Sequence, residues 1–98
     1  MPIQIKKLKR VKKLPGLTIE GLKPDTLVAL VADQNSKTPH IVYQTTVMPL
    51  QNGTVSIQVM PGEYTVRCIH LAYQVLDVTV YVKNDTTLNV VMLEETLY

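Results

Sequence analysis

The stretch that decides the fold runs from residue 54 to residue 93 and reads TVSIQVMPGEYTVRCIHLAYQVLDVTVYVKNDTTLNVVML. Valine or isoleucine occupies every second position of residues 54–60. Because successive side chains of a β-strand point to opposite faces, this period of two predicts a strand with one buried face. Pro61 and Gly62 follow. Proline removes a ladder donor and glycine tolerates positive φ, so the pair predicts a tight turn.

Three more strands are expected after this turn, and the first of them starts near Tyr64. Tyr64, Val66 and Cys68 share one face of that strand. The alternation then breaks at His70 and Leu71, which predicts a bend or a bulge.

The alternation is longest at residues 75–83, where leucine or valine occupies every even position. Most odd positions carry polar residues or tyrosine, so this segment predicts a strand with one buried and one exposed face. Asn84 and Asp85 favour a turn, and the fourth strand is expected from about Thr86 to Leu93.

Residues 61–67, PGEYTVR, resemble the P-G-x-Y-x-V signature of the carboxypeptidase regulatory-like, or prealbumin-like, β-sandwich family. Residues 87–90 (TLNV) resemble the closing strand of that family, and Ala72-Tyr73 stands where its members carry Gly-Tyr. The resemblance covers roughly the last half of the chain and brings no catalytic residues. It implies an immunoglobulin-like sandwich and a non-enzymatic module, commonly an adhesive or structural appendage.

The first half of the chain adds three further strands. They are expected at residues 17–20, 26–32 and 40–48. Residues 33–39 form a polar loop, and Asn52-Gly53 predicts a hairpin turn. Seven strands at spacings of roughly 8 to 12 residues are typical of a sandwich. The sequence therefore predicts an all-β protein with a single seven-stranded immunoglobulin-like (prealbumin-like) β-sandwich.

Charge divides the chain into an arm and a domain. Residues 1–14 hold six of the ten basic residues and no acid. Residues 15–98 hold four basic and eight acidic residues, which gives this part a net charge of −4. Pro15 and Gly16 mark the boundary. We therefore expect an extended basic N-terminal arm at residues 1–14 and the sandwich domain at residues 15–98.

Apolar residues recur at every third position of the arm, a spacing that fits neither a strand nor a helix and predicts an extended or partner-ordered segment. Three interpretations remain open: a solvated tail, docking on an acidic protein surface with the apolar residues as anchors, and binding to phosphates of nucleic acid. The arm offers no aromatic residue to stack on bases, and its spacing disfavours a membrane-surface helix. The predicted partner-binding residues are Ile5, Lys6, Lys7, Leu8, Lys9, Arg10, Val11, Lys12 and Lys13.

Two of the predicted strands are apolar on both faces, at residues 26–32 and at residues 90–93. Each sheet of a two-sheet sandwich buries one face, and burying a valine or leucine is worth roughly 1.5 to 3 kcal/mol. We expect the arm, a neighbouring subunit or a larger partner to cover the second face. The alternative is that residues 26–32 form a central strand whose outer face is only mildly apolar, at Ala29.

No grouping of residues points to catalysis, to a metal or to a cofactor. His40 and His70 are expected on separate strands, without further ligands at metal spacing. Neither Ser36 nor Ser56 lies in a nucleophile motif. The single cysteine, Cys68, can form no intrachain disulfide and is expected as a small buried hydrophobe. We therefore expect a protein that is not an enzyme.

Charge and expected compartment together suggest a function. The chain lacks both an apolar run of signal-peptide length after its basic start and a membrane-spanning apolar segment, so synthesis in the cytoplasm is expected. A small sandwich with an extended arm, made in the cytoplasm, looks like a phage head-decoration, tail or collar accessory protein that ends up in the virion. The expected function is structural: the arm and the apolar strands dock on a capsid or tail subunit, or on another copy. The alternatives are carbohydrate or cell-surface binding through Tyr81 and residues 33–39, and a nucleic-acid-binding accessory role.

Overall fold

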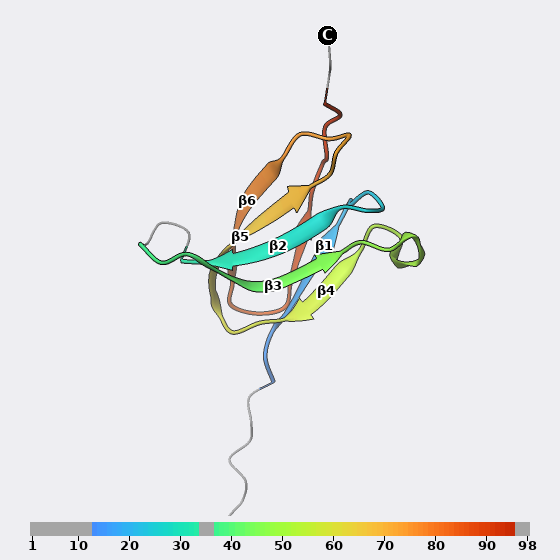
Figure 1. The fold of residues 1–98 in the computed structure, drawn as a ribbon. Coiled ribbons are helices and arrows are strands. Elements are labelled where there is room, and N and C mark those ends of the chain that lie inside the picture. Colours follow the sequence, from blue (N-terminus) through green and yellow to red (C-terminus); the bar gives the residue numbers. More distant parts are fainter. Residues whose placement is uncertain (1–12, 34–36, 96–98) are drawn as a thin grey trace, which may run out of the picture.

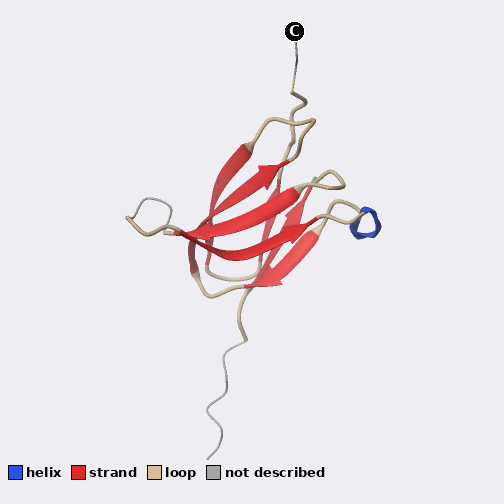
Figure 2. Ribbon diagram, in the orientation of Figure 1, coloured by secondary structure: helices blue, strands red, loops and turns tan. Residues whose placement is uncertain are grey.

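The computed structural model describes residues 13–33 and 37–95, and these residues form seven strands in two facing sheets (Figure 1). The strands are β1 (Gly16–Glu20), β2 (Leu27–Ala32), β3 (His40–Thr46), β4 (Val55–Gln58), β5 (Gly62–Ile69), β6 (Leu76–Val82) and β7 (Thr86–Asn89). A short 3₁₀ helix, η1 (Pro49–Gln51), lies between β3 and β4, and loops and turns make up the rest of the described chain (Figure 2). The predicted all-β class is confirmed.

The two sheets differ in size and in strand direction. One sheet has the order β4-β1-β7, with β1 antiparallel to β4 and parallel to β7. The other has the order β3-β2-β5-β6 and is antiparallel throughout. Among the described connections, those from β2 to β3 and from β5 to β6 stay within one sheet, whereas the others cross between the sheets. This repeated crossing gives the chain a sandwich-like arrangement.

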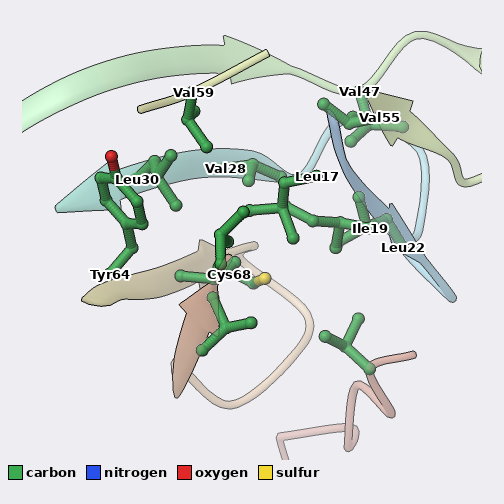
Figure 3. Close-up of a cluster of buried hydrophobic side chains, with 14 of the residues drawn as sticks. Leu17, Ile19, Leu22, Val28, Leu30, Val47, Val55, Val59, Tyr64 and Cys68 are labelled. Carbon is green, nitrogen blue, oxygen red and sulfur yellow. The ribbon is translucent and has the colours of Figure 1, made fainter. Parts of the chain in front are cut away.

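The core lies between the sheets and takes its side chains from alternate strand positions, as a period of two requires. Figure 3 shows side chains of both sheets meeting there, among them Leu17 of β1 and Val28 of β2. Both of these side chains are at most 1% exposed. Cys68 is fully buried in this core, as predicted, and burial raises the pKa of its thiol to about 11.

The predicted hairpin at Asn52-Gly53 is wrong, although both residues have positive φ (51° and 74°). They connect β3 to β4, which belong to different sheets. Asn52 ends η1 in a left-handed conformation, and the Leu22 N–H donates to the Gly53 carbonyl at 3.0 Å. A Cβ at Gly53 would lie 2.5 Å from the Leu22 carbonyl oxygen. The glycine is therefore needed for a close approach between two loops.

Pro61 and Gly62 also lie where the chain crosses between the sheets. The predicted interruption is confirmed, because β4 ends at Gln58 and β5 begins at Gly62. Gly62 does not use a positive φ, because the described glycines with positive φ are Gly21 and Gly53. Proline, which cannot donate to a ladder, accounts for the break.

The second face of β2 is covered within the chain. Ala29 and Val31, which point to the outer side of the four-stranded sheet, are only 5% and 6% exposed. Ala29 lies directly between Gln44 of β3 and Arg67 of β5, and Arg67 holds Asp77 of β6 at 2.8 Å. Long side chains on both sides shield the small alanine. The prediction that another molecule must cover this strand is therefore wrong, and the alternative of a central strand is confirmed.

Tyr64 gives a first prediction about stability. Its hydroxyl donates a hydrogen bond to the backbone carbonyl of Met60, just before Pro61, and its ring is buried in the core. Tyr64→Phe removes this bond but keeps the ring, so we expect a loss of about 0.5 to 1.5 kcal/mol in the free energy of unfolding, measured by urea denaturation. Tyr81→Phe, at an exposed tyrosine, is the control and is expected to leave the urea midpoint unchanged. Equal effects of the two substitutions would contradict this role of Tyr64.

The Arg67–Asp77 pair predicts a pH effect. Hydrogen bonds from the Arg67 guanidinium, at 2.8 and 3.1 Å, hold the pKa of the Asp77 carboxyl below its usual value. A lowered folded pKa means that the pair stabilises the fold above the unfolded pKa of about 3.9 and that this stabilisation is lost as the pH falls through the folded pKa. We expect Asp77→Asn to lower the urea midpoint at about pH 7 and to differ little from wild type at about pH 2. A difference that persists unchanged at the acidic pH would contradict this assignment.

Candidate protein-interaction surface

The most unusual feature of the described surface is a short pairing of two loop segments, residues 71–75 and 91–95, which we name the terminal ladder. The Gln74 N–H donates to the Leu93 carbonyl at 2.8 Å, and the Glu95 N–H donates to the Ala72 carbonyl at 2.9 Å. Between these two bonds Tyr73 lies opposite Glu94 in an antiparallel bridge. The ladder therefore joins the connection between β5 and β6 to the segment that follows β7.

His70 shapes the first half of the ladder. β5 ends at Ile69, which confirms the bend predicted at this point. The Ala72 N–H donates to Nδ1 of His70 at 3.0 Å, and the Tyr73 N–H donates to the His70 carbonyl at 3.1 Å. The Tyr73 ring lies edge-on to the imidazole, with 5.0 Å between the ring centroids. Because these bonds close a tight turn, Leu71 is held at its tip.

The second half of the ladder is the continuation of β7. The predicted strand end at Leu93 is wrong, because β7 ends at Asn89. Past this point Val90 and Met92 are buried, and Val90 donates its N–H to the Glu20 carbonyl at 2.9 Å. The Met92 sulfur accepts from the Thr26 hydroxyl at 3.5 Å, which anchors the segment on the core.

The side chains that the ladder leaves exposed are mainly apolar. Leu71 is fully exposed, Val91 is 73% exposed, and Val75 and Leu93 are about 60% exposed. The apolar second face predicted for residues 90–93 is therefore real, and its side chains Val91 and Leu93 remain uncovered in the described chain. All four side chains belong to the two paired segments, and exposed apolar side chains that gather in one region mark an interaction site more often than scattered ones do.

Acidic groups frame this apolar surface. An open hollow of about 550 Å³ is lined by Leu71, Ala72, Tyr73, Glu94 and Glu95. Both glutamates are exposed. A cation also lies at this end, since the Nζ of Lys23 is 5.9 Å from the centroid of the Tyr73 ring.

The arm enters the sandwich at the opposite end. Of the nine predicted partner-binding residues, Lys13 is described and exposed, and the other eight lie outside the described residues. Lys13 lines a second open hollow, of about 510 Å³, together with Lys83 and Asp85 at the connection from β6 to β7. The Asp85 carboxylate accepts the Gly16 N–H at 2.8 Å, which fixes the start of β1, and the chain bends at residues 83–85 between β6 and β7. β1 then runs away from this end towards the ladder (Figure 1).

Within the described residues, no group of three or more histidine, cysteine, aspartate or glutamate side chains is arranged to hold a metal ion. His40 lies 3.8 Å from Asp33 beside the loop after β2, whereas His70 lies in the turn of the terminal ladder. No helix among the residues that the structure describes is long and apolar enough to cross a membrane.

Tyr81, the residue expected to take part in carbohydrate binding, is well exposed. It is 67% exposed on the outer side of β6, opposite Glu63 of β5. Tyr43 and Tyr73 are partly buried against the core. One exposed ring offers a smaller platform than a set of neighbouring rings would.

Sequence reasoning missed Leu71 and Val75 as parts of a surface. Leu71 lies in the bend that was predicted, and Val75, which was assigned to a strand, directly precedes β6. The sequence did indicate that both side chains are exposed, because a leucine at the tip of a polar turn and a valine on the polar face of an alternating strand do not point into the core. What could not be read locally was that residues 91–95 lie beside them.

Comparison with known proteins identifies no family for this chain. The chain matches no protein-family model, and the search of curated proteins found no match to it.

Proposed function

We propose that the protein is a non-enzymatic assembly protein that binds other protein subunits. The observation that carries this proposal is the terminal ladder, which exposes four apolar side chains and holds an open hollow lined by one of them, Leu71, and by two glutamates. Exposing valine and leucine forfeits roughly 1.5 to 3 kcal/mol for each side chain that a partner could bury. A surface built in this way gains free energy by docking on another protein.

The finer fold type proposed is an immunoglobulin-like, prealbumin-like sandwich. Two features support it beyond the resemblance of residues 61–67. The Tyr64 hydroxyl bonds back to the backbone four residues upstream, as tyrosine corners of such sandwiches do. The seven strands divide into sheets of three and four, connected mostly by crossings between the sheets. Fold type alone does not define function.

The setting proposed is a virus particle, in which the protein would be a head-decoration, tail or collar accessory component of a phage. A segment with six basic residues and interleaved apolar residues suits docking along an acidic neighbouring subunit, because opposite charges orient the partners while the apolar groups supply affinity. The domain of net charge −4 would project from such a contact.

The virion proposal is tested by asking whether the protein sediments with virus particles or remains in the soluble fractions. A tagged full-length chain is expressed in the native host, and the lysate is fractionated on a density gradient. We expect the wild type to cosediment with particles at a fixed ratio to the major shell or tail protein. The triple variant Lys6→Glu, Lys7→Glu, Lys9→Glu should remain in the soluble fractions, while Lys37→Glu, a charge reversal on an exposed loop, should behave as wild type. Wild-type protein found only in soluble fractions would contradict the virion proposal.

Carbohydrate binding is the second candidate, and the exposed Tyr81 favours it. Sugar rings stack on such surfaces through their apolar faces. A glycan array probed with the wild type and with Tyr81→Ala decides this candidate: a signal lost in the variant supports it, and the absence of any signal removes it. Binding to nucleic acid is the third alternative. It would require the arm to overcome the repulsion of the acidic domain, and it would weaken steeply with salt.

A further inference from the structure

The terminal ladder and the arm have matching chemistry. The ladder combines exposed apolar side chains with the carboxylates of Glu94 and Glu95. The arm combines apolar residues at every third position with six cations. A segment that alternates apolar and basic residues fills an apolar hollow and pairs with carboxylates at its rim, so each part offers what the other lacks.

The two parts lie at opposite ends of the sandwich. β1 leads from the arm to the other end, where Glu20 lies beside Val90, and residues 91–95 continue in the same direction (Figure 1). At about 3.3 Å per residue, β1 and the segment from 89 to 94 together span about 30 Å.

Covalent geometry limits what the arm can reach in its own copy. Val11 lies five residues before Gly16 and reaches at most about 17 Å from it, and Leu8 reaches at most about 28 Å. Both distances fall short of the ladder, which lies about 30 Å away. An arm that turned back on its own domain could therefore not seat Val11 in the hollow, and Leu8 would fall just short of it even if the chain were fully extended.

We propose that residues 5–13 of one copy dock on the terminal ladder of a second copy, so that the chains associate head to tail. The proposal deepens the assembly function above and rests on it. Leu8 and Val11 enter the hollow beside Leu71, and the lysines pair with Glu94 and Glu95. Because the two contacting surfaces differ, the interface is heterologous, and repetition produces a ring or an open filament.

Two charge-reversed full-length variants test this geometry. One carries Lys6→Glu, Lys7→Glu and Lys9→Glu, and the other carries Glu94→Lys and Glu95→Lys. Light scattering over a concentration series should show wild type growing above the 11.0 kDa of a single chain, and each variant alone remaining at that mass. Mixed in equal amounts, the two variants should form complexes of at least two chains, because the basic arm of the ladder variant then meets the unchanged Glu94 and Glu95 of the arm variant.

The matched control is Asp33→Lys with Glu63→Lys, which makes the same change in charge at exposed positions beside the end of β2 and the start of β5, away from the ladder, and should assemble as wild type. Circular dichroism confirms that each variant is folded. A mixture that stays at the mass of one chain would overturn the head-to-tail contact, and so would a ladder variant that assembles by itself. If wild type is a single chain in solution and still cosediments with particles, the inference fails while the assembly function stands. If wild type assembles as described but never joins particles, the virion setting fails instead.

Discussion

Replacing Gly21 by alanine is expected to destabilise the protein by about 3 kcal/mol or more, a large part of the total stability of a small domain. Gly21 has a φ of +91°, and a Cβ there would lie 2.1 Å from the backbone carbonyl oxygen of Val90. Neither problem can be relieved by moving a side chain, because the obstacle is backbone. The Val90 segment would have to shift, which breaks its bond to Glu20 and loosens the segment that leads into the terminal ladder.

Gly16→Ala is the matched control for this prediction. Gly16 has no positive φ, and a Cβ there would lie 3.7 Å from a carboxylate oxygen of Asp85, which is an ordinary van der Waals distance. We expect its urea midpoint to stay close to that of wild type. Similar midpoints for Gly21→Ala and Gly16→Ala would contradict the close approach of the loop after β1 to the segment after β7.

Leu17→Ala should be the second large effect, with a loss of about 2 to 5 kcal/mol in the free energy of unfolding. Leu17 is completely buried in β1, the central strand of its sheet, and lies between Ile57 and Thr86. Truncation removes three carbon atoms from the core and leaves a cavity that paired strands on both sides cannot collapse.

The same substitution at Leu50 provides the comparison. Leu50 lies in η1 and is 95% exposed, so Leu50→Ala should change the unfolding free energy by less than about 0.5 kcal/mol. Urea denaturation of both variants measures the difference. If Leu50→Ala cost as much as Leu17→Ala, the exposed position of η1 would be wrong.

Local patterns predicted the strands better than the way in which they assemble. The even positions of residues 75–83 point inwards, and Val80 and Val82 are buried while Tyr81 is exposed. The alternation alone predicts which of these side chains are buried, because it depends only on strand geometry and on which side of the strand faces the core. Pairing between strands far apart in sequence leaves no such local trace. The parallel pairing of β1 with β7 therefore could not be read from the chain.

The turn residues were identified correctly, but the strands that they connect were not. Asn52 and Gly53 do adopt positive φ, yet they lead from one sheet to the other instead of closing a hairpin. Backbone preference fixes the conformation of such residues, while the core decides which strands they connect. The same limit applies to β7, which ends at Asn89 because the next residues turn to pair with residues 72–74.

The candidate site was predictable only in part. The sequence showed that residues 90–93 are apolar on both faces. In the structure the side chains of one face, Val91 and Leu93, are exposed. The similar pattern in β2 has a different outcome, because two neighbouring strands with long side chains cover it. Whether an apolar face remains open depends on the position of a strand within its sheet, and that is set by distant parts of the chain.

The most direct test of the proposed docking is a nuclear magnetic resonance titration that maps where the arm binds. The labelled protein is the full-length Lys6→Glu, Lys7→Glu, Lys9→Glu variant, which should be a single chain, and the ligand is a synthetic peptide of residues 1–13 with the wild-type sequence. The account predicts that the amide signals of residues 71–75 and 91–95 shift progressively and saturate, while those of β3 stay in place. A peptide in which the six basic residues are replaced by glutamate is the control and should cause no shift. Saturating shifts confined to another surface, or no shifts at all, would contradict the account.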